Sequence, residues 1–193
     1  MRTSVFVGTS LDGFIARSNG AFDFLSAAEG EPHGFHEFMA TVDAIVMGRN
    51  TYETVLPFSV WPYGEKPVFV LSTRPLLRAL GGVVVEHMDA TPSEVLSRLA
   101  ARGFEHVYVD GGVTIQSFLR AGLIDRLIVT RVPVLIGSGI PLFGPVDADI
   151  PVQHVATSHL ASGAVQSEYT INVPRIRTIR RKPDSETTGL TGA

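Results

Sequence analysis

The sequence predicts an α/β fold in which helices cover a central, largely parallel β-sheet. Two wholly apolar runs, residues 44–47 and 68–71, are typical of strands buried on both faces of such a sheet. Further strand-like runs alternate with segments in which apolar residues recur at helical spacing. Alternating strands and helices favour a parallel sheet between layers of helices, so we expect a sandwich architecture.

The first elements are short. Residues 5–7 form a β-branched and aromatic run that ends at Gly8 and an Asp12-Gly13 turn, and residues 14–16 resume an extended pattern. Phe35, Phe38 and Met39 are spaced three and four apart, which predicts one buried face of a helix over residues 33–41.

The middle of the chain repeats a strand-helix-strand pattern. A strand is expected at residues 83–85, then a helix over 92–102 between the N-cap Thr91 and the stop Gly103, then a strand at 107–109. A second helix over 114–121 ends at Gly122. Residues 127–134 and 165–173 read as later strands, and we expect antiparallel pairing there to close a mixed sheet.

Length and composition predict one domain and a tail. The 193 residues, 45% of them hydrophobic, suffice for a single sizeable core, and we place that domain at residues 1–174. Residues 175–193 are basic and then polar, with little to bury, and predict a flexible tail. A short cationic run opens that tail and could contact nucleic acid or an acidic neighbour, although a solvated tail is the simpler interpretation: Arg175, Arg177, Arg180, Arg181 and Lys182.

Composition also excludes several functions. The chain has no cysteine, which rules out disulfides, thiolate metal sites and cysteine nucleophiles. A net charge of -3 with 18% charged residues provides no broad basic field for nucleic acid or membranes. No apolar run approaches the roughly 20 residues of a membrane helix, and the first residues lack a signal-peptide pattern. We expect a cytoplasmic protein with a small-molecule partner.

Groups suited to phosphates follow three of the predicted strands. Gly48-Arg49-Asn50-Thr51 begins a helix after one strand, and Ser72-Thr73-Arg74 follows Leu71 at the end of another. Guanidinium groups bind phosphate oxygens bidentately, so these groups suit the 2′-phosphate of an adenosine ribose. Gly111-Gly112, after Asp110, would let a pyrophosphate approach backbone N–H groups at a helix start. Each group alone also fits an ordinary turn, but the three in this order favour a nucleotide.

Other candidate sites are weaker. His33 and His36 could share a metal, but no third ligand has suitable spacing, so we predict no metal site. Gly8-Thr9-Ser10 lacks the second glycine position of a nucleophile elbow. Phe58, Trp61 and Tyr63 lie in a Pro-containing loop, where they could stack on a flat substrate or form a lid or dimer contact.

Five motifs together resemble one family. They are Ser10-Leu11-Asp12-Gly13-Phe14-Ile15-Ala16, Asp43-Ala44-Ile45-Val46-Met47-Gly48-Arg49-Asn50-Thr51-Tyr52-Glu53, Asp110-Gly111-Gly112, Gly122-Leu123-Ile124-Asp125-Arg126-Leu127 and Gly137-Ser138-Gly139-Ile140-Pro141-Leu142-Phe143. In order and spacing they resemble the dihydrofolate reductase-like superfamily, especially the C-terminal reductase domain of the riboflavin-biosynthesis deaminase-reductase. The resemblance runs from about Val5 to Tyr169. It implies a three-layer dihydrofolate reductase-like sandwich that binds NADPH.

The resemblance also assigns cofactor residues. Ile15 and Ala16 would lie along the nicotinamide half. The phosphates and the adenosine end would meet Gly48, Arg49 and Thr51, and the 2′-phosphate pocket would be completed by Leu71, Ser72, Thr73 and Arg74. The pyrophosphate would be held by the glycine-pair turn, which comprises Gly111, Gly112, Val113, Thr114 and Ile115.

By that resemblance the protein transfers a hydride to a small pyrimidine- or pterin-like heterocycle, as 5-amino-6-(5-phosphoribosylamino)uracil reductase does. The alternatives are dihydrofolate reductase activity or a non-catalytic nucleotide-binding protein.

Asp12 and Glu37 are the candidate catalytic residues. The segment after Thr51 lacks the Asn-Pro element of the riboflavin reductases, which leaves the substrate open, and Asp23 and Glu31 are further candidates for the carboxylate that anchors a pteridine. Related reductases are often dimers, so a homodimer is expected.

Overall fold

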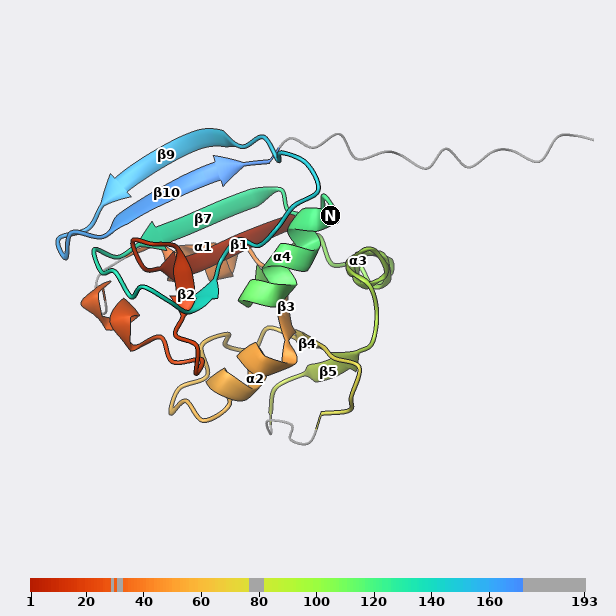
Figure 1. The fold of residues 1–193 in the computed structure, drawn as a ribbon. Helices are drawn as coiled ribbons and strands as arrows, with labels where there is room; N and C mark the ends of the chain where they lie inside the picture. The colour runs from red at the N-terminus through yellow and green to blue at the C-terminus, as the bar shows by residue number, and fades with distance from the viewer. Residues whose placement is uncertain (29, 31–32, 77–81, 172–193) are drawn as a thin grey trace, which may run out of the picture.

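The computed structural model describes residues 1–28, 30, 33–76 and 82–171, and Figure 1 shows their arrangement. Eight strands form one sheet in the order β5-β4-β3-β6-β1-β7-β10-β9, and β2 pairs with β8. The elements in chain order are β1 (Arg2–Thr9), β2 (Phe14–Ala16), the 3-10 helix η1 (Asp23–Ala28), α1 (Phe35–Ala40), β3 (Ala44–Gly48), α2 (Arg49–Val55), β4 (Val68–Leu71), β5 (Val85–Met88), α3 (Pro92–Ala101), β6 (His106–Asp110), α4 (Gly112–Arg120), β7 (Arg126–Arg131), β8 (Ile140–Pro141), β9 (Gln153–His159) and β10 (Val165–Thr170).

The sheet is mixed and largely parallel, as the sequence predicts. Strands β5, β4, β3, β6, β1 and β7 pair in parallel, whereas β10 is antiparallel to both β7 and β9. Strand β3 lies between β4 and β6. The carboxyl ends of these three strands are therefore neighbours on one edge of the sheet, where ligands of such sheets commonly bind.

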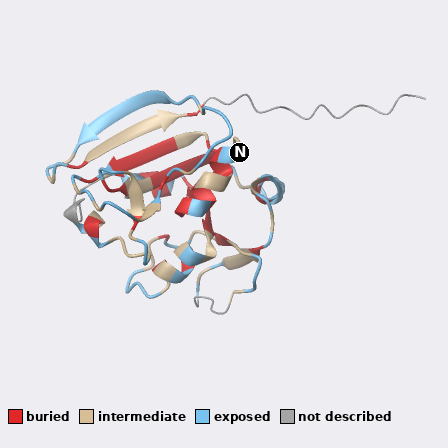
Figure 2. Cartoon of the chain, viewed as in Figure 1, coloured by how far each residue is buried: buried red, intermediate tan, exposed pale blue. Residues whose placement is uncertain are grey.

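Two apolar cores hold the layers together. On one face of the sheet, Leu99 of α3 and Phe118 of α4 are fully buried against the strands. On the other face, Phe38 of α1 and Tyr52 of α2 belong to a second buried cluster. Figure 2 shows the buried strands in the centre of the molecule. Burial on both faces explains why the predicted strands at residues 44–47 and 68–71 are wholly apolar.

Several element boundaries differ from those expected. β5 lies two residues later than predicted and includes Glu86 and His87, because an edge strand can carry polar side chains. β7 ends at Arg131, two residues before Pro133, which has no N–H to donate to a ladder. The expected N-cap Thr91 is confirmed, since its side chain and Glu94 form a capping box. The predicted tail at 175–193, and residues 172–173 of the last predicted strand, lie outside the described residues.

A buried polar cluster stabilises the opposite edge of the sheet. His106, the first residue of β6, is 4% exposed. Its Nε2 lies 2.8 Å from the Ser4 hydroxyl, and its Nδ1 lies 2.7 Å from the carbonyl oxygen of Thr41. The Asp43 carboxylate accepts the backbone N–H of His106 at 2.7 Å. This cluster joins β1, β6 and the segment before β3 at their amino ends.

We expect this histidine to make the fold sensitive to mild acid. Burial lowers the pKa of His106, so the folded protein resists protonation that the unfolded chain accepts below its ordinary pKa of about 6.5. Stability should therefore fall as pH drops from that value toward the lower folded pKa. The urea concentration at the unfolding midpoint, measured between about pH 5 and pH 7.5, should fall more steeply with decreasing pH for the native protein than for His106→Gln. Equal slopes would contradict this role.

Candidate active site

The groups that the sequence places after three strands meet at one edge of the sheet. Gly48 ends β3, Leu71 ends β4, and Asp110 ends β6. The register pairs Gly48 with Leu71 and Met47 with Asp110. The three predicted phosphate-binding segments therefore begin side by side.

Glycines allow these segments to pack without intervening side chains. Gly111 has φ of 89°, and a methyl group at this position would overlap the Thr51 hydroxyl. A methyl group on Gly48 would lie 2.9 Å from the Thr114 hydroxyl, and one on Gly112 would lie 2.8 Å from Cδ1 of Ile15. Residues from three of the predicted segments thus pack closely around the glycine backbone at this edge, which we call the cradle.

The start of α4 points backbone N–H groups without a side-chain cap among the described residues toward this cradle. Its N-cap, Gly111, has no side chain that could bond to the first N–H groups, in contrast to Thr91 at the start of α3. The uncapped first turn of a helix favours an anion. Val113 is 73% exposed there. Ile115 is placed differently, because its side chain is fully buried in the core and its N–H donates to the Gly111 carbonyl at 2.8 Å.

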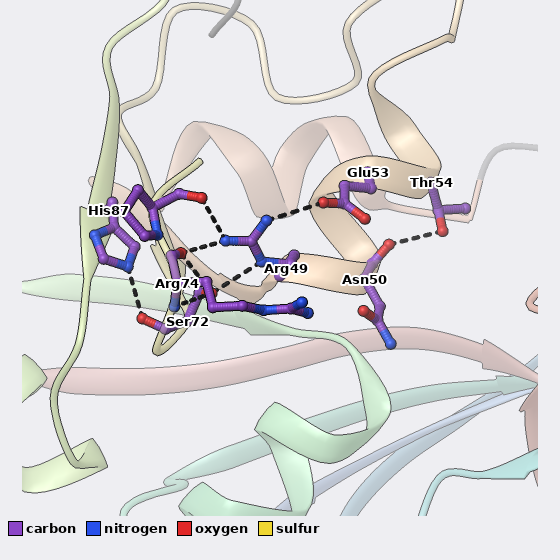
Figure 3. Close-up of polar contacts among 8 residues, drawn as sticks. Arg49, Asn50, Glu53, Thr54, Ser72, Arg74 and His87 are labelled. Atoms are coloured by element: carbon purple, nitrogen blue, oxygen red, sulfur yellow. Dashed lines mark hydrogen bonds and ion pairs between the residues drawn. The ribbon is translucent and has the colours of Figure 1, made fainter. Parts of the chain in front are cut away.

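Arg49 connects two loops rather than extending into solvent (Figure 3). Its Nε donates to the Ser72 hydroxyl at 2.9 Å, and its Nη2 donates to the carbonyl of Arg74 and, at 2.6 Å, to that of Pro75. Its Nη1 forms an ion pair with Glu53 at 3.2 Å. The guanidinium is thus occupied by the protein, and it fixes the loop after β4 against the first turn of α2.

The other arginine of the pair, Arg74, is exposed, and Figure 3 shows its side chain extending alongside Arg49. Within the described part of the chain its guanidinium has no ion-pair partner. Ser72 orients this loop, since its hydroxyl accepts the backbone N–H of Arg74 at 3.0 Å and its carbonyl lies 2.6 Å from Nε2 of His87. Thr73 is exposed in the same turn. The geometry therefore presents Arg74 as the cation available to a phosphate.

A partly buried carboxyl group that the sequence did not single out completes this edge. Asp110 accepts the Gly111 N–H at 2.7 Å with one oxygen and the Tyr63 hydroxyl at 2.7 Å with the other. Desolvation by burial raises the pKa of Asp110 despite these hydrogen bonds. The signal in the sequence was an acidic residue between a buried strand and a glycine pair. A carboxyl group with a raised pKa is a candidate proton donor.

The two predicted catalytic residues lie elsewhere. The Asp12 carboxylate accepts the N–H groups of Gly137 at 2.7 Å and Ile136 at 3.3 Å, which joins two loops. A hydrogen bond from Ser10, together with these backbone donors, lowers the pKa of Asp12, so it holds a proton poorly near neutral pH. Glu37 lies on the exposed side of α1, while Phe38 faces the core. Catalytic roles for Asp12 and Glu37 remain predictions.

The two residues that the resemblance assigns to the nicotinamide half lie beside the glycine pair. Ile15 is half-buried in β2 and contacts Gly112, as described above. Ala16 is buried, and a methyl group on Gly139 would overlap its carbonyl oxygen. β2 pairs with β8, whose Ile140 also lies close to Gly112. Ile15 and Ala16 therefore form one wall of the cradle.

Aromatic residues of the loop between α2 and β4 approach the site from the other side. Tyr63 is 4% exposed, and its ring meets that of Trp61 edge-on at 5.1 Å. The indole Nε1 of Trp61 is buried without a hydrogen-bond partner among the described residues. Phe58 is 42% exposed and contacts the ring of Phe22. Tyr63 is thus a structural contact of Asp110, whereas Phe58 presents an open aromatic face.

Two further observations concern the described residues only. No helix among them is long and apolar enough to cross a membrane. No three histidine, aspartate or glutamate side chains gather closely enough there to bind a metal ion.

The geometry agrees with a family comparison. Residues 4–165 match the family model described as the RibD C-terminal domain. The chain belongs to the RibD C-terminal domain family. It is therefore a reductase-family domain, as the five motifs indicate.

Relatives of this RibD C-terminal domain cover nearly the whole chain. A putative riboflavin biosynthesis protein from Shewanella sp. PV-4 has a solved structure with 38% identity and a TM-score of 0.83, over 90% of this chain and 100% of that one. The uncharacterized protein YwjB of Bacillus subtilis is 32% identical over 171 residues, which are 87% of this chain and 97% of its own.

A third comparison concerns the fold. Dihydrofolate reductase from Enterococcus faecalis, solved with NADP(H), matches with a TM-score of 0.62 and 18% identity over 89% of this chain and 97% of that one. The RibD C-terminal domain described here thus has the dihydrofolate reductase-like fold that the sequence predicts. The first turn of α4 also fits the pyrophosphate of a dinucleotide, because its N-cap, Gly111, leaves the first N–H groups without a side-chain cap.

Proposed function

We propose that the protein is an NADPH-dependent reductase that transfers a hydride to a small pyrimidine- or pterin-like heterocycle. The observation that carries the proposal is the convergence of Thr51, Gly111 and Arg74 at one strand edge of a reductase-family domain. The uncapped first turn of α4 suits a pyrophosphate, and an exposed guanidinium on the neighbouring loop suits the 2′-phosphate that distinguishes NADPH from NADH. A cytoplasmic location and a heterocyclic substrate are part of the same proposal.

Each part of the cradle has a separate role in binding. The N–H groups of Gly112, Val113 and Thr114 would bind the pyrophosphate at the start of α4. Arg74 would bind the 2′-phosphate, with Thr73 as a hydroxyl donor, and the Ser72 hydroxyl, which donates to the Arg74 carbonyl at 2.8 Å, would orient their loop. Arg49 holds the loop that carries these residues, because its guanidinium donates hydrogen bonds to the Ser72 hydroxyl and to the backbone carbonyls of Arg74 and Pro75. Ile15 and Ala16 would cover the nicotinamide half.

The chain's own contribution to chemistry is orientation and a proton. NADPH, when bound, supplies the hydride and its electron pair. Hydride addition to carbon leaves negative charge on the adjacent nitrogen or oxygen of a C=N or C=O bond. Asp110, whose pKa is raised by burial, would donate the balancing proton from its protonated form and be reprotonated from water. The Tyr63 hydroxyl fixes the orientation of that carboxyl group.

The experiment that tests this function is a reduction assay with substrates of two classes. Purified protein with NADPH is mixed with a ribosylaminopyrimidine or with dihydrofolate, and loss of nicotinamide absorbance is followed together with product mass. Turnover of the pyrimidine supports the riboflavin-type activity, and turnover of dihydrofolate supports the alternative within the superfamily. NADPH binding without turnover of any heterocycle indicates a non-catalytic nucleotide-binding protein and rejects the reductase proposal.

A further inference from the structure

An apolar hollow lies between α4 and the paired strands β7 and β10. It has a volume of about 590 Å³, which is the size of a small-molecule site. Residues from the segment 143–152, which leads from β8 to β9 (Figure 1), supply one of its walls. None of the predicted cofactor residues lines the hollow, and neither does Asp110. It is therefore a second candidate site, which the proposed reductase function does not use.

The hollow is lined by apolar side chains along the two strands. Leu119 of α4, Leu127 of β7 and Val165 of β10 belong to its lining. The register pairs Tyr169 with Leu127 at one end of the hollow and Val165 with Arg131 at the other, and all four residues line it. From Leu127 to Arg131 the hollow extends about 13 Å along β7. A ligand with an extended apolar chain fits this shape.

One end of the hollow holds donors that lack acceptors. Arg131 lines it and forms no ion pair with another described residue. Thr9 of β1 is the register partner of Arg131, so both side chains lie on the same face of the sheet. Thr9 is 1% exposed, and its hydroxyl has no hydrogen-bond partner among the described residues. An anionic group, which a guanidinium binds bidentately, is the chemistry that this end of the hollow lacks.

The acidic residue of the lining belongs to the other end. Asp149 shortly precedes Gln153, which pairs with Thr170 at the end of β10, whereas Arg131 pairs with Val165 at the beginning of that strand. Asp149 forms no ion pair with a described residue either. A carboxylate bound to Arg131 would therefore lie away from Asp149, and the charge of the ligand complements the end that it contacts.

We propose that this hollow binds an acyl-chain monocarboxylate of medium length, with its carboxylate on Arg131 and its chain along β7 and β10. Phe143, Val146 and Val152 line the hollow while remaining about half exposed, so they would gain cover from the chain. Each methylene group buried there strengthens binding about fourfold. A neutral or cationic amphiphile would leave the guanidinium without a counter-ion, which favours the acid.

The test is calorimetric titration of the full chain with decanoate, octanoate and decanol. Decanoate should bind at one site per chain. Octanoate should bind about tenfold more weakly, because its shorter chain buries fewer methylene groups. Decanol has the same chain length without the charge, and it should also bind about tenfold more weakly.

Variants of the lining separate the charge from the chain. Arg131→Gln should weaken decanoate at least about tenfold and leave decanol within about threefold of its native affinity. Ser167→Trp should exclude both ligands, because Ser167 lines the hollow between Val165 and Tyr169 and the indole would fill it. Arg98→Gln is the matched control, since Arg98 is exposed on α3 and lies outside the lining, and it should change neither affinity.

Amide exchange locates the bound acid and distinguishes other occupants. Decanoate should slow exchange in residues 143–152, whereas slower exchange confined to the start of α4 would place it in the cradle and overturn the proposal. Decanoate affinity that falls as protein concentration rises would assign the hollow to a second copy of the chain. Absence of binding, or an affinity that Arg131→Gln leaves intact, would also overturn it. These measurements do not depend on turnover, so their failure leaves the reductase proposal untouched.

Discussion

Replacing Asp110 with asparagine is expected to lower the rate of substrate reduction about 100-fold. Asparagine keeps the size of the side chain but cannot transfer a proton to the reduced heterocycle. NADPH affinity should stay within about threefold, because Asp110 contacts the glycine turn only through the Gly111 N–H. Single-turnover reduction, followed after mixing enzyme saturated with NADPH and substrate, separates the chemical step from binding.

The pH profile identifies the proton donor independently. Because the acid must be protonated, the rate should fall as pH rises through the raised pKa of Asp110. Tyr63→Phe removes a hydrogen bond that lowers this pKa, so the alkaline limb should move to higher pH. Asp12→Asn is the control, and it should leave the limb in place. Native-like rates and an unchanged profile in Asp110→Asn would exclude this carboxyl group as the acid.

The free energy of unfolding should also depend on the ionisation of the Asp110 carboxyl group. A carboxyl group whose pKa is raised on folding contributes stability below its unfolded pKa, and that contribution is lost as pH rises through the folded pKa. The stability of the native protein relative to Asp110→Asn should therefore decline from acid toward neutral pH. A difference that does not change with pH would show that the carboxyl group is not destabilised by burial.

Gly111→Ala is expected to reduce the free energy of unfolding by about 2–4 kcal/mol and to abolish measurable NADPH binding. The backbone φ of 89° disfavours any L side chain, and the new methyl group would overlap the Thr51 hydroxyl. Relief of that overlap would require the start of α4 to move away from α2, which opens the cradle. Urea unfolding and NADPH titration measure the two effects.

A matched glycine separates backbone strain from overlap. Gly137 has φ of 76°, but nothing lies within 4 Å of a methyl group there. Gly137→Ala should reduce the free energy of unfolding by about 1–2 kcal/mol, which is the cost of the backbone conformation alone, and it should keep NADPH binding. Adding Thr51→Ala to Gly111→Ala should recover part of the stability, because it removes the overlapping hydroxyl. If Gly111→Ala binds NADPH with native affinity, the glycine turn does not hold the cofactor.

Local patterns predicted the strands of the centre and the place of the site. Residues 44–47 and 68–71 are apolar because both faces of β3 and β4 are buried, and polar groups directly after them meet because parallel strands end at one edge. β9 was missed because every one of its residues is exposed, so no alternation of apolar and polar positions marks it. Edge strands of this kind are defined by pairing, which the sequence does not display.

The roles of individual side chains were less accessible from sequence. Arg49 and Arg74 look equivalent as cations after neighbouring strands, but only the fold shows that Arg49 donates to Ser72 and to backbone carbonyls. Asp110 looks like a turn residue until burial and the Tyr63 contact are known. Ile115 was assigned with its neighbours in the glycine-pair turn, yet helical periodicity turns its side chain into the core.

The most direct test of the central claim is calorimetric titration of the full chain with NADPH and, separately, with NADH. We expect NADPH to bind at least about tenfold more tightly, and Arg74→Ala to remove that preference while leaving NADH affinity unchanged. Arg49→Ala should weaken both nucleotides, because it releases the loop after β4, and Arg120→Ala, at the exposed end of α4, should change neither. Failure of both nucleotides to bind, or an equal loss of both in Arg74→Ala, would contradict the assignment of this edge as an NADPH site.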